Sequence, residues 1–327
     1  MWPIYMDHVE IAGGKSNCIP LKFINGEWKF DVEELRAKLK RPQCKILLFN
    51  SPHNPTGKVF SLEEMQTISD ILDECPHVIV LYDAVYENLV FDGHKHLYFG
   101  SIGNNWDRTI SIFSGGKFFC ATGWKVGWAI GPKKLIYFGG VIANTIYETF
   151  QTGAQVAMGR TLDIAHNTKN IEVENPKTGE KEMVTYAESM LRIFQINRDF
   201  MTNEFNKMDL PVTVLPSDSG YFVMLDITKC KDLVPAKYFE THDYEDPAMG
   251  PAVTKTIKNM PDGTVPLDMA FCRWFAIEYG VIMLPNSNFY GRDSTAETIS
   301  YNHVRVAICK ELAYLEGAIE KVKKFTK

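Results

Sequence analysis

The first 135 residues alternate short apolar segments with helical patterns, and this alternation limits the possible folds more than any other feature of the chain. Between the first two apolar segments, Ser61 and Glu64 form a capping-box pattern ahead of apolar residues at helical spacing. Such alternation is typical of βαβ units, so we predict an α/β fold with a mainly parallel sheet. The predicted strands are residues 45–50 (KILLFN), 77–82 (HVIVLY), 109–113 (TISIF) and 126–130.

The second half of the chain has a different pattern. Helical residues run from 135 to 167, and a polar, turn-forming stretch over residues 167–181 follows. We therefore predict two domains: a large parallel-sheet domain over residues 1–165 and a smaller α+β domain over residues 166–327. In the second we expect a long amphipathic helix (186–208), strands (212–215, 221–227, 304–309), a helix near 269–279, a C-terminal helix and a loop over 241–263.

Composition excludes several classes of protein. The 35 basic and 40 acidic side chains give a net charge of −5, which provides no basic footprint for nucleic acid and favours a small-molecule partner. No stretch approaches 18 uninterrupted apolar residues, so we expect no membrane span. The first residues lack the regions of a signal peptide.

Cysteine and histidine usage predicts neither disulfides nor a metal site. The seven cysteines are scattered, odd in number and never in a C-x-x-C pair, which is typical of a reducing compartment. His94 and His96 form an H-x-H pair without a third ligand at recognisable spacing, so we expect two solvated loop histidines and no metal.

Four polar motifs follow strand-like segments: NSPHNPTG (50–57), YDAVYE (82–87), SGGKFFCATGWKVGW (114–128) and HVRVAICK (303–310). Open α/β sheets bind ligands beyond the carboxyl ends of their strands, so these motifs are the first candidates for function. Each also has a structural interpretation. Lys117 could be a solvated loop lysine, Asp83 a turn cap and NPTG a common turn.

Taken together, the four motifs resemble the fold-type I aminotransferases that use pyridoxal phosphate, especially the branch of kynurenine aminotransferase, glutamine transaminase K and cysteine-S-conjugate β-lyase. The resemblance runs from Trp2 to the C-terminus. It implies a fold-type I large domain and a smaller C-terminal domain. Because family members carry further residues before the segment that matches Trp2, we expect an N-terminally truncated form that lacks part of the phosphate-binding apparatus.

The resemblance also implies a role for each matching residue. Lys117 corresponds to the lysine that forms the Schiff base and moves the substrate's α-proton, and the two glycines before it are expected to let the backbone approach a ligand. Asp83 corresponds to the carboxylate that keeps the pyridine nitrogen protonated. The implied partners of the cofactor's phenolic oxygen are Tyr86 and Asn54, the second of which also lies in the substrate site. The implied phosphate ligands are Ser114 and Lys125.

Two further residues complete the implied site. Arg305 corresponds to the arginine that holds the substrate α-carboxylate in a bidentate fork, and a structural ion pair is its alternative. Trp2 corresponds to the aromatic residue that stacks on the pyridine ring, with a disordered terminus as the alternative. For Lys125, the alternative to a phosphate ligand is a lysine on the protein surface.

The implied activity is ping-pong transamination between an L-amino acid and a 2-oxo acid, with kynurenine, glutamine, aromatic or sulfur-containing donors. β-Elimination from cysteine S-conjugates and a catalytically impaired dimerisation partner are the alternatives. We expect a homodimer in the cytoplasm, with the mitochondrion left open.

Overall fold

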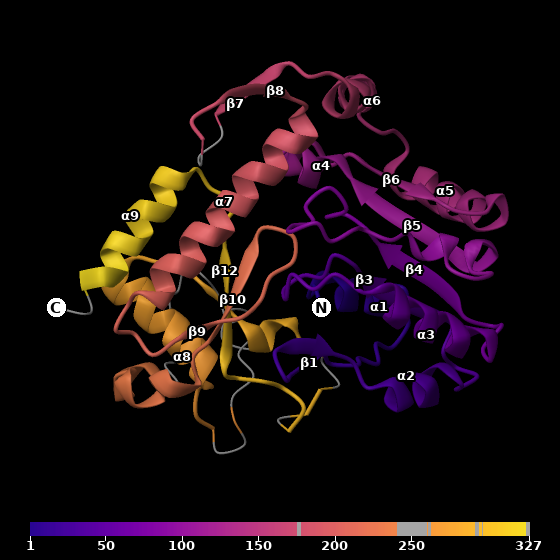
Figure 1. Ribbon diagram of the computed structural model, residues 1–327. Helices are drawn as coiled ribbons and strands as arrows, with labels where there is room; N and C mark the ends of the chain where they lie inside the picture. The colour runs from indigo at the N-terminus through magenta and orange to yellow at the C-terminus, as the bar shows by residue number, and fades with distance from the viewer. Residues whose placement is uncertain (175–177, 241–259, 261–262, 292–293, 296, 325–327) are drawn as a thin grey trace. The chain divides into compact units, whose positions relative to one another are not determined.

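The computed structural model describes residues 1–174, 178–240, 260, 263–291, 294–295 and 297–324. Its contacts divide the chain into two units. The parallel-sheet unit comprises residues 31–196 and 218–220, and the antiparallel-sheet unit comprises the remaining segments, 1–30, 197–217 and 221–327 (Figure 1). The domain boundary between residues 165 and 166 stays a prediction. The loop predicted over 241–263 lies outside the described residues, apart from residues 260 and 263.

The parallel-sheet unit is built on a four-stranded sheet with the order β3-β4-β5-β6. The strands β3 (Ile46–Asn50), β4 (Ile79–Asp83) and β5 (Thr109–Ser114) are parallel, and β6 (Gly127–Ile130) is antiparallel to β5. All four were predicted from apolar runs, and the predicted α/β class with a mainly parallel sheet is confirmed. The central strand β4 is the most deeply buried, with Val80 and Tyr82 both 0% exposed.

The helix α3 (Leu62–Asp73) begins where its sequence predicts. Ser61 Oγ accepts from the Glu64 N–H at 3.1 Å, and Glu64 Oε2 accepts from the Ser61 N–H at 2.9 Å. This capping box satisfies backbone donors that the first helical turn leaves without partners. On the inner face, Met65, Ile71 and Leu72 are 0% exposed. Burial of this stripe fixes the helix on the unit.

Further elements of the unit follow the chain. They are α2 (Val32–Leu39), the 3₁₀ turns η1 (Phe99–Ser101), η2 (Trp106–Arg108) and η3 (Thr122–Trp124), α4 (Gly115–Phe118), α5 (Lys133–Tyr147), α6 (Thr152–Asn167), the hairpin β7 (Ile171–Glu174) and β8 (Lys181–Val184), and the first part of α7 (Tyr186–Asn206). The strand β7 lies in the stretch over residues 167–181 that was predicted to be turn-forming, and β8 begins at the last residue of that stretch. These two strands carry both polar and apolar residues: Val184 is 2% exposed, and on the exposed side Lys181 pairs with Glu172 of the other strand at 2.8 Å.

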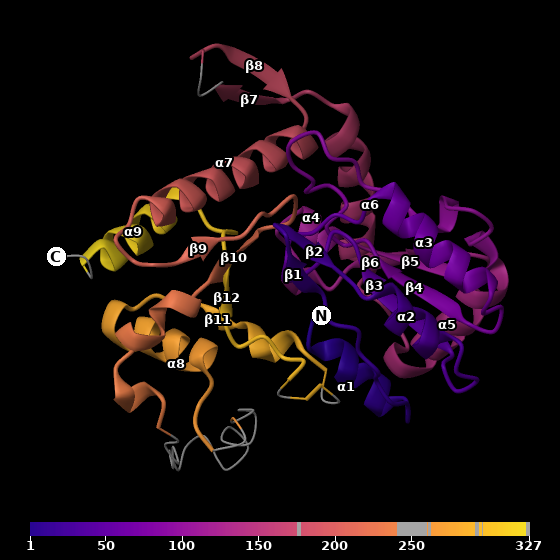
Figure 2. The ribbon, with the colours of Figure 1, turned by 60° about the horizontal axis from the view of Figure 1, so that its bottom comes forward.

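The antiparallel-sheet unit has a sheet with the order β11-β12-β10-β9 (Figure 2). Its core includes Val223 and Val304 from the sheet and Phe271 and Phe275 from the helical side, all 0% exposed. The elements are α1 (Ile4–Ile11), β1 (Lys22–Ile24), β2 (Glu27–Lys29), the end of α7, β9 (Thr213–Val214), β10 (Phe222–Asp226), η4 (Thr228–Leu233), η5 (Ala236–Tyr238), α8 (Leu267–Trp274) with a π-helical turn (Phe275–Tyr279), β11 (Leu284–Pro285), η8 (Asn286–Phe289), β12 (His303–Ala307) and α9 (Leu312–Lys323).

Two expectations from the sequence concern a membrane span and the environment of His96. No helix within the described ranges is long and apolar enough to cross a membrane. His96 differs from its prediction: its ring stacks on Tyr82 at 5.9 Å and contacts Tyr98 edge-on at 4.7 Å, so it is a packing residue rather than a solvated one. Burial lowers the pKa of His96 to about 4 and keeps the ring neutral.

Candidate active site

The carboxyl ends of β3, β4 and β5 lie at one edge of the sheet. Asn50 pairs with Asp83 and Asp83 with Ile112 in the parallel register, so β3 and β4 end level with each other and β5 runs two residues further, to Ser114. Lys125 reaches the same edge, because Gly127, two residues later, pairs with Ser114 in the antiparallel β6. Three of the four motifs, those over residues 50–57, 82–87 and 114–128, therefore lie at the same edge of this sheet.

The loop after β3 carries Asn54, which is 5% exposed. Its N–H donates to the Asn50 side-chain oxygen at 2.7 Å. The loop closes on itself through His53 N–H to the Lys58 carbonyl at 2.9 Å and Gly57 N–H to the His53 carbonyl at 2.8 Å. Gly57 has φ = 70°, a left-handed conformation that glycine adopts without strain. The backbone of Asn54 is thus fixed before any ligand binds.

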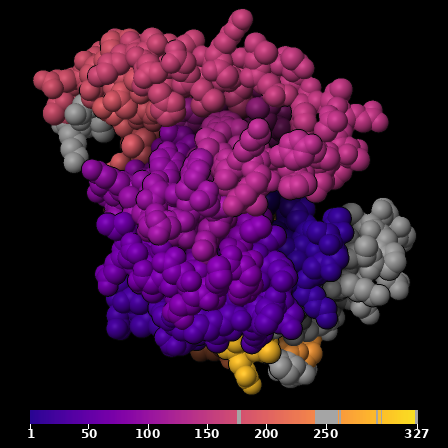
Figure 3. Space-filling model, turned by 90° about the vertical axis from the view of Figure 1, so that its right-hand side faces the viewer, coloured from indigo at the N-terminus to yellow at the C-terminus, as the bar shows by residue number. Residues whose placement is uncertain are grey.

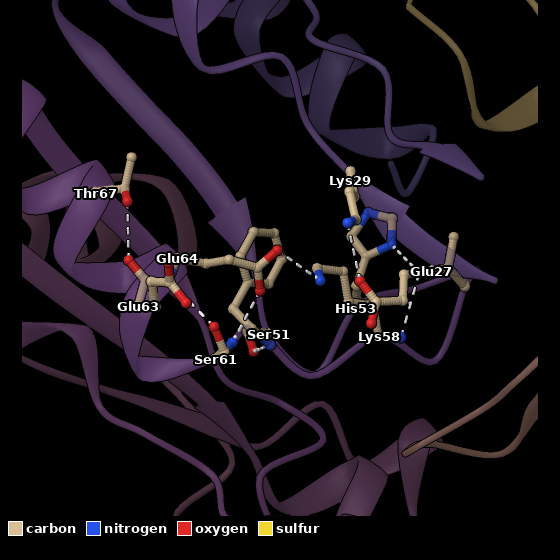
Figure 4. A network of polar contacts seen from close by, with 11 residues as sticks. Glu27, Lys29, Ser51, His53, Lys58, Ser61, Glu63, Glu64 and Thr67 are labelled. Atoms are coloured by element: carbon tan, nitrogen blue, oxygen red, sulfur yellow. Dashed lines mark hydrogen bonds and ion pairs between the residues drawn. The ribbon is translucent and has the colours of Figure 1, made fainter. Parts of the chain in front are cut away.

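The far side of this loop is anchored to the start of α3 (Figure 4). Ser51 Oγ accepts from the Phe60 N–H at 3.2 Å, and the Lys58 ammonium pairs with Glu64 at 2.7 Å. The same Glu64 carboxylate caps the helix through Ser61. One acidic side chain therefore joins the loop to the helix that packs on the sheet.

Asp83 is the last residue of β4, and Tyr86 lies in the turn that follows. Asp83 is 8% exposed, and its Oδ1 accepts from the Val85 N–H at 3.0 Å. Tyr86 is 4% exposed, and its carbonyl accepts from the Leu89 N–H at 2.9 Å. The cap predicted as the structural interpretation of Asp83 is present. This bond involves one oxygen of the carboxylate.

The turn after β5 carries Ser114 and Lys117. Ser114 is the N-cap of α4, where its Oγ accepts from the Lys117 N–H at 3.3 Å. A Cβ on Gly115 would lie 1.8 Å from Met158 Sδ, and one on Gly116 would lie 3.0 Å from the Thr122 Cα. The glycines therefore admit close packing by the chain's own residues, and the expectation that they let the backbone approach a ligand stays a prediction.

Lys117 and Lys125 differ in their surroundings. Lys117 is half-buried, and Lys125 is exposed. Lys125 also has a left-handed backbone, with φ = 54° and ψ = 35°, at the end of η3. A non-glycine residue in this conformation is uncommon and is retained where the surrounding structure requires it.

The remaining two predicted residues belong to the antiparallel-sheet unit. The Arg305 guanidinium lies 4.5 Å from the ring centroid of Phe222 and 4.8 Å from that of Phe289. Aromatic faces attract the cation and fix the plane of its fork. Trp2 is 39% exposed and contacts Tyr5 edge-on at 5.6 Å.

Sequence reasoning missed Asn50 at the strand ends. It is 5% exposed, and its side chain bonds to both Asn54 and Asp83. The available signal was a polar residue closing an otherwise apolar strand, KILLFN. No cluster of three possible metal ligands occurs among the residues whose structure is described.

Comparison with known proteins identifies the class. The family model for aminotransferases of class I and II matches residues 1–322, and the chain belongs to this family. Its fold agrees with that of Bna3p from Saccharomyces cerevisiae, at a TM-score of 0.79 and 26% identity over 100% of this chain and 69% of that one. N-Succinyldiaminopimelate aminotransferase from Mycobacterium tuberculosis gives a TM-score of 0.72 and 26% identity over 97% of this chain and 67% of that one.

Within the family, the chain is similar to kynurenine–oxoglutarate transaminases. It is 33% identical to the enzyme of Dictyostelium discoideum over 99% of this chain and 69% of that protein. It is 30% identical to kynurenine–oxoglutarate transaminase 1 of Rattus norvegicus over 92% of this chain and 62% of that protein. The chain thus spans about two thirds of the length of these relatives.

Proposed function

We propose that this chain transfers an amino group from an L-amino acid to a 2-oxo acid with pyridoxal phosphate as cofactor, by a ping-pong route. The observation that carries the proposal is the parallel register of β3, β4 and β5, whose carboxyl ends lie at one edge of the sheet. Asp83 closes β4 there, and Asn54 and Lys117 lie just beyond the ends of β3 and β5. An amide, a carboxylate and an amine at one sheet edge are the groups that this cofactor requires.

The side chains at this edge of the sheet fit pyridoxal phosphate. Lys117 supplies a primary amine for its aldehyde, and Asp83 supplies an acceptor for its ring N–H. Asn54 and Tyr86 supply donors for its phenolic oxygen. For the phosphate, Ser114 can donate through its hydroxyl while it accepts from the Lys117 N–H, and Lys125 adds positive charge, so these two residues would hold that group.

When bound, the cofactor supplies an electron sink that makes the α-hydrogen of an amino acid acidic. The Lys117 amine would take this proton from the α-carbon and return it during transfer. The Asp83 carboxylate would hold the proton on the ring nitrogen. Arg305, with its plane fixed by Phe222 and Phe289, would bind the substrate α-carboxylate through two parallel N–H···O bonds.

The proposed donors are kynurenine, glutamine and other aromatic or sulfur-containing amino acids. The similarity to transaminases named for kynurenine and oxoglutarate supports this choice. A cytoplasmic location is proposed from the seven scattered cysteines.

A homodimer is proposed as the assembly. Its support is the apolar surface of α5, a helix without a buried residue (Figure 3 views the side of the unit on which α5 lies). Apolar side chains exposed by 48% to 66% gather there, and such surfaces mark protein contacts. They are Tyr137, Phe138, Val141, Ile142, Ile146 and Tyr147 of the helix, and Phe150 shortly after it.

Reconstitution with pyridoxal phosphate tests the function. We expect the folded chain to gain a visible absorbance that Lys117→Ala abolishes, and Lys134→Ala, a change at an exposed lysine of α5, leaves in place. Release of pyruvate and ammonia from a cysteine S-conjugate, in excess over transfer to a 2-oxo acid, would instead assign β-elimination. A folded chain that gains no absorbance contradicts the proposal.

A further inference from the structure

Asn50 joins two strand ends through one side chain. It is the last residue of β3, is 5% exposed, and stands opposite Asp83 in the register with β4. Its Nδ2 donates to the Asp83 carbonyl at 2.9 Å, and its Oδ1 accepts from the Asn54 N–H at 2.7 Å. A carboxamide is needed because the two partners require a donor and an acceptor in one short planar group.

The two bonds connect segments that the backbone ladder alone does not join. The Ser51 N–H also donates to the Asp83 carbonyl, at 3.1 Å, but the β3–β4 ladder ends there and Asn54 lies beyond it in the loop. Within the described residues, the Asn50 side chain bridges the Asn54 backbone to Asp83 directly.

We infer that Asn50 is a positioning residue, which fixes the backbone of Asn54 relative to Asp83 and so sets the spacing between the amide and the carboxylate of the site. The two hydrogen bonds exist without a ligand. Only the statement that the spacing serves the cofactor rests on the proposed function. Asn50 itself is assigned no contact with the cofactor or substrate.

The first experiment needs no cofactor. Amide hydrogen exchange at Asn54 is compared between the wild-type chain and Asn50→Ala, in which the acceptor of that N–H is lost. We expect exchange at Asn54 to quicken by about tenfold or more beyond any change in global stability, because the buried N–H loses its partner. Asn50→Asp retains an acceptor oxygen for the Asn54 N–H but loses the donor to the Asp83 carbonyl, so it should restore the protection only in part.

A matched control is Asn105→Ala in the same unit. Asn105 is 0% exposed, and its Nδ2 donates to Ser69 Oγ at 2.7 Å and to the Ile102 carbonyl at 2.8 Å. Asn105 is therefore, like Asn50, a buried asparagine whose side chain makes two hydrogen bonds. It differs from Asn50 in its position, because it precedes β5 and does not stand at the carboxyl end of a strand. Its loss should lower global stability without a selective effect at Asn54. An equal loss of Asn54 protection in both variants overturns the inference.

The second experiment follows the bound cofactor through its absorbance as the pH is varied. A donor on the phenolic oxygen favours its deprotonated form, so misplacing Asn54 should move the midpoint of the spectral change to higher pH. Asn50→Ala should shift this midpoint by at least half as much as Asn54→Ala does. The double variant should show no larger shift than Asn54→Ala alone. Additive shifts would show that Asn50 acts independently of Asn54 and would overturn the inference.

The two experiments separate this inference from the proposed function. If the wild-type chain gains no absorbance while Asn54 loses protection selectively in Asn50→Ala, the positioning role stands and the proposed function fails. If the wild-type chain binds the cofactor and Asn50→Ala changes neither exchange at Asn54 nor the midpoint, the function stands and the positioning role fails.

Discussion

The Cβ position of Gly115 is occupied by Met158, whose Sδ would lie 1.8 Å from an added methyl group. Met158 is 3% exposed, so its side chain can move only by displacing buried neighbours. We expect Gly115→Ala to lower the free energy of unfolding by about 1–3 kcal/mol, the usual effect of overpacking. Urea denaturation measures this change. Because Lys117 is two residues away, affinity for pyridoxal phosphate should fall as well.

Two variants control this prediction. Gly139 lies within α5 with nothing within 4 Å of its Cβ position, so Gly139→Ala should stabilise the chain by about 0.5–1 kcal/mol. Met158→Ala makes room beside Gly115, so the double variant Gly115→Ala, Met158→Ala should lose less than the sum of the two single changes. Strict additivity would mean that Met158 is not the obstacle.

Stability should depend on pH through Asp268, at the start of α8. This side chain is 0% exposed, and burial raises its pKa to about 6 although it accepts from the Ser287 N–H at 2.7 Å. The unfolded carboxyl titrates near 3.8, so the folded state favours the protonated form. The resulting stabilisation is present below about pH 4 and is lost as the pH rises through 6. Its size is on the order of 3 kcal/mol.

Unfolding free energies measured from pH 4 to 7 test this sign. Asp268→Asn should remove this decline, whatever its absolute stability, and leave the rise of stability with pH that His96 contributes over the same window, because the pKa of His96 is lowered to about 4. Glu316→Gln, at an exposed position of α9, should keep the wild-type slope. An unchanged slope in Asp268→Asn would assign the pH dependence to other groups.

The stacking of Arg305 between two rings predicts a loss of substrate binding in Arg305→Lys. Lysine keeps the charge but lacks the planar fork, so KM for both the amino acid and the oxo acid should rise about tenfold or more, which corresponds to about 1.4 kcal/mol. Steady-state kinetics on the reconstituted chain measure this. Arg192→Lys, which changes an exposed pair with Glu182, should leave both KM values unchanged. Equal KM values in Arg305→Lys and wild type would remove Arg305 from the site.

The apolar surface of α5 predicts that Phe138→Glu disrupts the proposed homodimer. Phe138 is 66% exposed, and a charge there would be costly to bury in an interface. Light scattering should report a lower mass for this variant than for the wild-type chain. Tyr314→Glu on α9, where Tyr314 is 71% exposed, serves as the control and should leave the mass unchanged. A wild-type monomer contradicts the proposed assembly.

Elements with strong local patterns were predicted well from the sequence. The helix after Ser61 and the long helix from Tyr186 both occur where expected, because capping residues and apolar stripes act within a few turns of chain. Weakly patterned elements were missed: α1, α2 and the hairpin of β1 and β2. The hairpin had a usable signal, since Asn25 and Gly26 both adopt positive φ in its turn, as the Asn-Gly pair favours.

The sequence by itself determined the alternation of strands and helices, the family motifs and the chemical types of the site residues. The tertiary structure decided what those residues contact. Only the register of β3 and β4 sets Asn50 opposite Asp83, and only the fold brings Met158 against Gly115 and two rings against Arg305. These contacts join residues far apart along the chain, and local sequence does not specify them because they depend on strand register and on the packing of whole elements.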